Sequence, residues 1–242
     1  MKRTLVIGDC HGGLKALEEV FRKASVSLQD KLIFLGDYVD GWSESAQLIN
    51  YLIRLSAGQE CVFLKGNHDI WCEEWLDRSS TDVDWLIHGG QSTIRSYSKL
   101  DLAAREKHLQ FFKELKWYHI DDQNRLFVHA GFTSLAGPAG EKDTSNFCWD
   151  RSLWETALAT NKNISCDSPL YPKQLKLFRE IYIGHTPTIN YTVKIPMHAC
   201  NVWNIDTGAA FSGRLTVMDI DTKTYWQSEA VRTFYPNENG RN

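Results

Sequence analysis

Residues 4–13 read TLVIGDCHGG, so a β-branched, apolar run passes directly into an aspartate, a histidine and two glycines. Four later apolar runs end in a similar polar, glycine-containing segment, and they lie at 32–35, 61–64, 125–128 and 181–183. The segments between the first three runs carry apolar residues at helical spacing. The order strand, helix, strand, helix, strand is therefore predicted for residues 4–64, which begins an α/β fold with a buried sheet.

The remainder of the chain predicts a cap and a second sheet. Residues 70–117 are rich in helical periodicity, and residues 134–172 are a loop-rich stretch that contains glycine and proline. We interpret these two segments as a cap. Three later apolar runs are expected to be strands that close a second sheet, and they lie at 202–205, 215–220 and 224–230. The expected fold class is α/β, a two-sheet β-sandwich flanked by helices, in a single domain that spans residues 1–242.

The composition limits the classes of function. Of 242 residues, 43% are hydrophobic and 24% are charged, and the formal net charge is −3, which is typical of a globular protein without a dominant nucleic-acid surface. The first apolar run is too short for a signal peptide, and no apolar run reaches the roughly 18 residues that span a bilayer. The six cysteines contain no C-x-x-C pair, which favours reduced thiols and a cytoplasmic location.

Five predicted strand ends place a residue of the metal-ligand type beside a glycine, in the motifs GDCHGG at 8–13, GDYVDG at 36–41, GNHD at 66–69, HAG at 129–131 and GHT at 184–186. Each motif alone has a structural explanation: Asp9 as a helix N-cap, Asp37 and Asp40 as turn formers, His129 as a histidine bonded to the backbone. Ligands of open α/β folds bind beyond the carboxyl ends of the strands. Five strand ends of this kind therefore predict one binding site, at the edge of the fold where the strands end.

The residue types predict a metal centre. Carboxylate, imidazole and amide oxygen suit first-row divalent ions, and the absence of cysteine ligands argues against a structural zinc site. Two ions about 3.5–4 Å apart can share a bridging carboxylate, lower the pKa of a bound water and polarise a phosphoryl group. We expect two divalent ions as cofactors, with Mn²⁺ favoured and Fe, Zn or Ni as alternatives.

The ordered motifs resemble those of the calcineurin-like metallophosphoesterases, in particular the branch with the Ser/Thr protein phosphatases, their bacterial relatives and the bis(5′-nucleosyl)-tetraphosphatases. The resemblance extends from Asp9 to the segment 206–216. It implies hydrolysis of a phosphate ester by a hydroxide that bridges two metals. The implied ligands of the first metal are Asp9, His11 and Asp37, and those of the second are Asp37, Asn67, His129 and His185.

The resemblance also implies catalytic and substrate-binding residues. His68 is the implied general acid, and Asp40 orients and charges it, since a carboxylate beside an imidazole favours the protonated ring. The alternative is that His68 only positions Asn67. Arg151 and Asn67 are the expected substrate-binding residues, because a guanidinium suits a bidentate grip on phosphoryl oxygens. The alternative for Arg151 is a surface ion pair with Asp150 or Glu155.

One position departs from the pattern of the protein phosphatases, which have an arginine directly after the second aspartate of GDxVDRG. This chain has Gly41 there, so one phosphate-binding cation is missing. The departure favours a nucleotide, a diester or a small phosphate compound as substrate. Trp42, Trp71 and Trp75 either stack a base or pack in the core. His88, without a motif around it, is interpreted as an ordinary surface or packing residue.

Several functions remain open at this stage. The principal hypothesis is a metal-dependent phosphoesterase that acts on a phosphorylated small molecule, a nucleotide or a phosphoprotein. A symmetrical dinucleoside tetraphosphatase and a Ser/Thr protein phosphatase are alternatives within the same class. A non-catalytic metal-binding module is an alternative of another class, supported only by the missing arginine at position 41. No membrane partner is expected.

Overall fold

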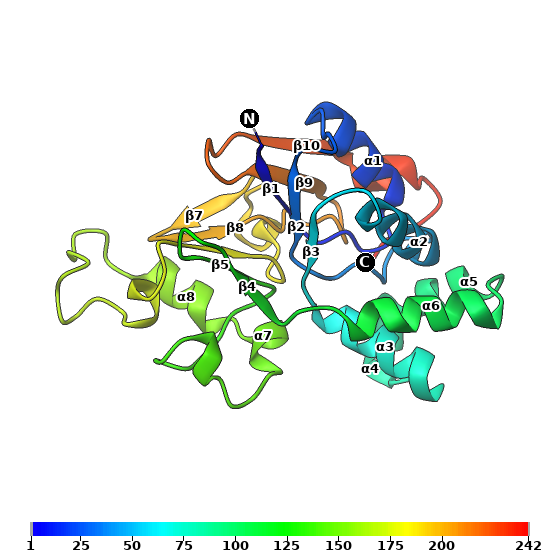
Figure 1. The fold of residues 1–242 in the computed structure, drawn as a ribbon, viewed down its shortest axis with the longest axis horizontal. Coiled ribbons are helices and arrows are strands. Elements are labelled where there is room, and N and C mark those ends of the chain that lie inside the picture. The colour runs from blue at the N-terminus through cyan, green and yellow to red at the C-terminus, as the bar shows by residue number, and fades with distance from the viewer. Residues whose placement is uncertain (1, 242) are drawn as a thin grey trace.

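The protein is described by a computed structural model that covers residues 2–241, and it contains two five-stranded sheets (Figure 1). The first sheet has the order β10-β9-β1-β2-β3. Its strands are β1 (Thr4–Ile7), β2 (Lys31–Phe34), β3 (Cys61–Phe63), β9 (Arg214–Asp219) and β10 (Tyr225–Ala230). β1, β2 and β3 are parallel, whereas β9 pairs antiparallel with both β1 and β10. The carboxyl ends of the three parallel strands therefore lie at one edge.

The second sheet has the order β4-β5-β6-β8-β7. Its strands are β4 (Tyr118–Ile120), β5 (Arg125–Val128), β6 (Glu180–Ile183), β7 (Met197–Ala199) and β8 (Val202–Asn204). The central strands β5, β6 and β8 are parallel, and the edge strands β4 and β7 are antiparallel to their neighbours. Side chains of both sheets, such as Val6, Ile33, Phe127 and Tyr182, are buried against one another in one apolar cluster. The two sheets thus form a sandwich.

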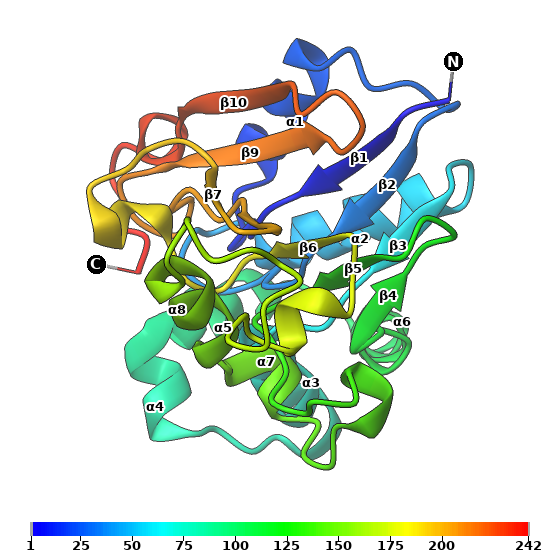
Figure 2. The ribbon, with the colours of Figure 1, turned by 90° about the vertical axis from the view of Figure 1, so that its left-hand side faces the viewer.

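Helices flank both sheets. Beside the first sheet lie α1 (Leu14–Lys23) and α2 (Ser45–Ser56), and α1 buries one face because its apolar residues recur at helical spacing. The next helical segment comprises α3 (Asn67–Arg78), α4 (Val83–Trp85), η1 (Leu86–Gly90), α5 (Gln91–Tyr97) and α6 (Leu102–Lys113). The helices α7 (Asn146–Trp149) and α8 (Ser152–Ala159) lie on the side of the second sheet (Figure 2). Short helical turns are η2 (Pro138–Gly140), η3 (Gln174–Lys176), η4 (Thr188–Tyr191) and η5 (Val231–Phe234).

The predicted fold class, an α/β two-sheet sandwich flanked by helices, is confirmed, but two strands were assigned to the wrong sheet. The runs at 215–220 and 224–230 were expected to close the second sheet, and they form β9 and β10 of the first. The alternation of apolar residues shows that a segment is a strand but not which strand it pairs with, because pairing depends on register. The three-residue edge strands β4 and β7 were not predicted. No helix in the described part of the chain has the length and apolar character needed to cross a membrane.

Candidate metal centre

The loops after β1, β2 and β3 are tied together by their own backbone. The N–H groups of Cys10 and His11 both donate to the carbonyl of Asp37, at 3.0 and 2.9 Å. The carboxylate of Asp69 accepts from three further backbone N–H groups, at 2.8 to 2.9 Å, those of Gly66, Asp37 and Tyr38. Asp69 therefore fixes the loop after β2 to the start of α3. The sequence interpretation did not assign it, although an aspartate at the third position of a helix is a capping signal.

Asp37 lies at the centre of the site. Its Oδ2 is 3.5 Å from Nε2 of His11 and 3.5 Å from Nε2 of His129, which follow β1 and β5 in different sheets. Two groups with metal-binding atoms close together share this aspartate: one comprises His11, Asp37 and His68, and the other Asp37, His129 and His185. His11, Asp37 and His185 have positive φ angles of 47°, 53° and 65°. Such left-handed backbone is uncommon outside glycine and clusters at functional sites.

The two histidines beside Asp37 present unprotonated nitrogens to it. Nδ1 of His129 donates to the carbonyl of Leu35 at 2.8 Å, and Nδ1 of His11 lies 3.1 Å from the carbonyls of Val39 and Asp40. A carbonyl only accepts, so in each neutral ring the proton is on Nδ1 and the lone pair is on Nε2. This is the usual orientation of a metal-binding histidine whose other nitrogen is held by the backbone.

Asn67 and His185 complete the second group. Oδ1 of Asn67, the first residue of α3, lies 3.3 Å from Nε2 of His129 and 3.0 Å from Nδ1 of His185. Oδ1 of Asn67, Oδ2 of Asp37 and the lone pair of His129 thus converge without a proton between them. Electron-rich atoms that meet in this way are favoured by a cation in their midst, so the donor set fits a divalent metal.

Asp9 contacts the loop that carries His185. Its Oδ2 accepts the backbone N–H of His185 at 3.0 Å, and its buried Oδ1 has no hydrogen-bond partner. Burial, followed by the charges of Asp206 and Asp37, raises the pKa of Asp9 well above its usual range. Burial likewise raises the pKa of Asp37 and of Asp206 to about 7. Three buried carboxylates that repel one another fit a site for cations, and Asp206 belongs to it although the sequence interpretation gave it no role.

His68 and Asp40 form a buried pair beside the metal-ligand groups. Nδ1 of His68 lies 2.6 Å from Oδ2 of Asp40, and the backbone N–H of His68 donates to Oδ1 of Asp37 at 3.0 Å. The carboxylate of Asp40 also accepts from Nε1 of Trp85 at 2.7 Å and from Oγ1 of Thr93 at 2.6 Å. Nε2 of His68 is buried, has no hydrogen-bond partner and lies with His11 and Asp37. It is therefore the atom from which a proton could be delivered.

Burial opposes the charged form of this pair. It raises the pKa of Asp40 to about 7, although Thr93 and Trp85 act in the other direction. It lowers the pKa of His68 well below the usual value, and the charge of Arg241 adds to this effect. The attraction between a carboxylate and an imidazolium, which favours the charged pair, is thus opposed by burial. In the folded protein, desolvation works against both charges and favours the uncharged pair, in which the carboxyl of Asp40 donates to Nδ1 of His68 and the ring keeps its proton on Nε2.

A cavity of about 390 Å³ leads to the metal-ligand residues and forms the mouth of the site. Both predicted cap segments border it, and its lining comprises Asn67, Trp71, Asp84, His88, Trp149, Arg151, His185, Pro187, Asn190, Phe211 and Arg241. Arg151 lies here without an ion pair to any described carboxylate, since Asp150 instead accepts the backbone N–H groups of Ser152 and Leu153. Among residues 2–241 no ion pair joins Arg151 to Asp150 or to Glu155, the two partners that the sequence offered as an alternative.

Aromatic side chains line one part of the mouth. The ring of Trp71 contacts His68 and Trp149 edge to face, with centroids 5.1 and 5.2 Å apart, and stacks on His88 at 6.1 Å. His88, which was interpreted as an ordinary residue, thus belongs to the mouth. Trp42 is fully buried in the core, and Trp75 packs against Trp85 and Tyr97. Of the three tryptophans considered for base stacking, the cavity lining includes only Trp71, and Trp149 joins it.

Oxygen and nitrogen ligands gathered at the strand ends of two sheets are the kind of site that metal-dependent hydrolases use. A model of the family described as calcineurin-like phosphoesterase matches residues 2–205. The chain is 28% identical over 232 residues, with 88% of each chain covered, to the bis(5′-nucleosyl)-tetraphosphatase PrpE, described as asymmetrical, of Bacillus thuringiensis (strain Al Hakam). The chain therefore belongs to the calcineurin-like phosphoesterase family and is a metallophosphoesterase, a hydrolase of phosphoric esters.

Solved structures show the same fold. A protein serine/threonine phosphatase from Saccharomyces cerevisiae superposes with a TM-score of 0.62 at 15% identity, and the match covers 95% of this chain and 80% of that one. A metallophosphoesterase from Sphaerobacter thermophilus gives a TM-score of 0.54 at 19% identity, with 94% and 87% covered. At these identities the likeness establishes the architecture and leaves the substrate to be argued from the site.

Proposed function

We propose that the protein hydrolyses a phosphate ester or anhydride with two divalent metal ions, Mn²⁺ being the favoured ion. The residues that would hold the first ion are Asp9, His11 and Asp37, and those that would hold the second are Asp37, Asn67, His129 and His185. The observation that carries the proposal is the position of Asp37, whose Oδ2 lies 3.5 Å from an imidazole nitrogen of each group. When bound, the ions would lower the pKa of a water so that it can attack phosphorus, and would polarise the phosphoryl oxygens.

The residues around the ligands have separate tasks in this proposal. His68 protonates the leaving oxygen from Nε2, while Asp40 holds the ring through Nδ1 at 2.6 Å. Trp85 and Thr93 hold Asp40 in turn, so the ring of His68 has one orientation. Arg151 binds phosphoryl oxygens at the mouth, and the amide of Asn67 lies within reach of the same group. The buried site excludes water that would compete with these contacts.

A dinucleoside tetraphosphate cleaved asymmetrically is the substrate that we favour within this class. The support is the name of the Bacillus relative together with the aromatic side chains of the mouth, where Trp149, at 43% exposure, can stack a base beside Trp71. Symmetrical cleavage, the first alternative from the sequence, is not favoured by that name. A phosphoprotein substrate has only the fold likeness to a protein phosphatase in its support.

A substrate panel tests these proposals together. The purified protein, loaded with Mn²⁺, Zn²⁺ or Ni²⁺, is assayed on p-nitrophenyl phosphate, its bis-ester, diadenosine tetraphosphate and a phosphoserine peptide. We expect ester hydrolysis that depends on metal, and conversion of the tetraphosphate to nucleoside triphosphate and monophosphate. Two nucleoside diphosphates would identify symmetrical cleavage instead. Bound metal without turnover of any compound would overturn the proposal in favour of a non-catalytic module.

Two further parts of the proposal concern the whole chain. We treat residues 1–242 as one catalytic domain with segments 70–117 and 134–172 as its cap, and the support is that helices of both segments border the mouth. We also propose a cytoplasmic location. All six cysteines are free thiols in the structure, which suits a reducing compartment.

A further inference from the structure

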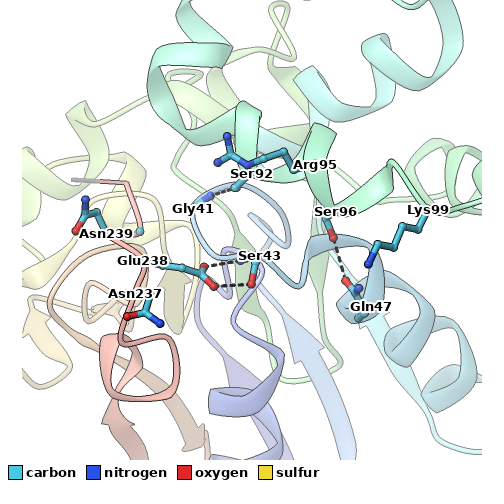
Figure 3. Close-up of a pocket in the computed structure, with 11 residues that line it drawn as sticks. Gly41, Ser43, Gln47, Ser92, Arg95, Ser96, Lys99, Asn237, Glu238 and Asn239 are labelled. Atoms are coloured by element: carbon cyan, nitrogen blue, oxygen red, sulfur yellow. Dashed lines mark hydrogen bonds between the residues drawn. The ribbon is translucent and has the colours of Figure 1, made fainter.

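The segment after η5 returns from β10 to the mouth of the site and is fastened there. The ring of Tyr235 stacks on Trp42 with centroids 5.3 Å apart. The carboxylate of Glu238 accepts from the backbone N–H and the hydroxyl of Ser43, at 2.9 and 2.7 Å (Figure 3). The backbone N–H of Arg241 then donates to the carbonyl of Ala210 at 2.9 Å. These contacts hold residues 235–241 against the loop that follows Asp40 and against the segment between β8 and β9.

The side chain of Arg241 passes over two glycines. A Cβ atom placed on Gly41 or on Gly89 would lie 3.2 Å from Cγ of Arg241, which is tighter than ordinary van der Waals contact. Both glycines have strongly positive φ angles, 108° and 107°, which other residues rarely adopt. Figure 3 shows Gly41 held by Ser92, whose hydroxyl accepts its N–H at 2.9 Å. The absence of a side chain at position 41 therefore leaves room for the stem of Arg241.

The guanidinium group of Arg241 reaches the catalytic cavity. It lines the same 390 Å³ cavity as Arg151 and His185, and its centre lies 5.3 Å from the ring centroid of Phe211. Its Nε is buried without a hydrogen-bond partner, and within residues 2–241 no carboxylate forms an ion pair with it. A partly buried cation held over an aromatic ring and left without a counter-ion among residues 2–241 is suited to receive an anion.

Electrostatic effects place this charge near the reacting groups. The positive charge of Arg241 lowers the pKa of the carboxyls of Asp37 and Asp40, against the larger effect of burial, and it also disfavours protonation of His68. Arg151 has a corresponding effect on His185. Arg241 acts on His185 as well, so the fields of the two arginines overlap at the site, and a phosphoryl group between them would be within both.

We propose, on the basis of the phosphoesterase activity proposed above, that Arg241 is a substrate-binding residue that grips the phosphoryl group together with Arg151. It occupies the space that Gly41 leaves open, so a residue from the far end of the chain supplies the cation that the loop after Asp40 lacks. The segment 235–241 serves as the strap that carries it. A planar guanidinium binds two phosphoryl oxygens at once and favours the charge that develops on them during cleavage.

The test compares Arg241→Gln with Arg232→Gln, which changes an exposed arginine of η5 in the same part of the chain. Loss of a charge-assisted contact is expected to raise KM for p-nitrophenyl phosphate about 10- to 100-fold in Arg241→Gln. The Kd of inorganic phosphate, measured by calorimetry on the Mn²⁺-loaded protein, should rise by a similar factor. Arg241→Lys should recover part of the affinity, and added guanidinium ion should partly rescue Arg241→Gln but not the control.

The outcomes separate this inference from the proposed function. If the native protein hydrolyses esters and Arg241→Gln matches Arg232→Gln in KM and phosphate affinity, Arg241 only anchors the strap and the inference is wrong. If the native protein hydrolyses none of the compounds, the proposed function has failed, and phosphate calorimetry alone still decides the role of Arg241. If Arg241→Gln melts well below the native protein, the test uses Arg241→Lys and the rescue by guanidinium ion instead. Failure of both to recover phosphate affinity would then show that Arg241 does not bind the phosphoryl group.

Discussion

The metal-ligand residues and the residues of the mouth are held in different ways. Asp37 and His129 are buried to within 2% exposure, and they sit directly at strand ends where backbone hydrogen bonds fix them. Trp149 is 43% exposed, Arg151 is exposed, and Arg241 comes from a strap far along the chain. The centre is thus built by the sheets, and the mouth by segments attached to them. Rigid strand ends can fix reactive groups, while the attached segments can vary what is bound.

The contrast predicts that changes at the centre abolish chemistry and changes at the mouth alter binding. The largest effect is expected from Asp37→Asn, which removes the carboxylate shared by both ligand groups. We expect kcat for p-nitrophenyl phosphate to fall by at least about 10³-fold and bound Mn²⁺, measured by mass spectrometry, to fall with it. Asp122→Asn, at an exposed aspartate, is the control. If Asp37→Asn keeps its full metal content and the native kcat, Asp37 is not part of the metal centre.

A somewhat smaller effect is expected from His68→Asn. Without the proton donor, kcat should fall by about 10²–10³-fold, and more for phenyl phosphate than for p-nitrophenyl phosphate, because the poorer leaving group needs protonation more. Metal content should remain native because His68 is not among the proposed ligands, and a loss of metal would show that it binds the ion together with His11 and Asp37. His198→Asn, at an exposed histidine stacked on Trp203, is the control. Equal losses for both leaving groups would show that His68 only positions its neighbours.

At the mouth, Trp149→Ala should change binding rather than chemistry. Loss of one base-stacking face is expected to raise KM for diadenosine tetraphosphate about 10-fold. The KM for p-nitrophenyl phosphate should change little, because that compound has no base. Tyr225→Ala, at a 39% exposed tyrosine of β10, is the control. If the two substrates lose affinity in parallel, Trp149 shapes the mouth without contacting a base.

The smallest expected effect concerns the charge of the centre itself. Burial raises the pKa of Asp206 from 3.8 to about 7, so the folded protein binds this proton more tightly than the unfolded chain. Proton binding by Asp206 therefore stabilises the folded state most below pH 3.8, and this stabilisation is lost as pH rises through about 7. In Asp206→Asn, the amide oxygen would still accept the N–H of Gly208, and the charge would be gone. With a chelator present, this variant should therefore gain stability over the native protein between about pH 5 and pH 8, by roughly 2 kcal/mol or about 4–8 °C in Tm.

Saturating Mn²⁺ is the control for this last prediction. A bound cation compensates the carboxylates, so the advantage of Asp206→Asn should shrink or reverse when the metal is present. Thermal melts at the two ends of that pH range, with chelator and with Mn²⁺, provide the comparison. An advantage that does not grow from the acidic to the alkaline end would show that the charge of Asp206 does not contribute.

The fold class and the neighbourhood of the ligand motifs were predictable because both depend on local patterns. An apolar run followed by glycine, aspartate and histidine marks a strand end, and parallel strands bring such ends together. The contacts of Asp40 were not predictable in the same way. Trp85 and Thr93 lie 45 and 53 residues from it and have no motif around them. Only the packing of α4 and α5 against the loop after β2 brings them to its carboxylate.

By itself, the sequence determined that this chain forms strands ending in metal-type ligands, since each motif carries its own turn and its own ligand. Tertiary structure alone decided that β9 and β10 join the first sheet, that Asp206 lies near Asp9, and that Arg241 fills the space over Gly41. The physical reason is that those features are contacts between segments distant in the chain. Their energies come from register and packing, for which no short stretch of residues holds a signature.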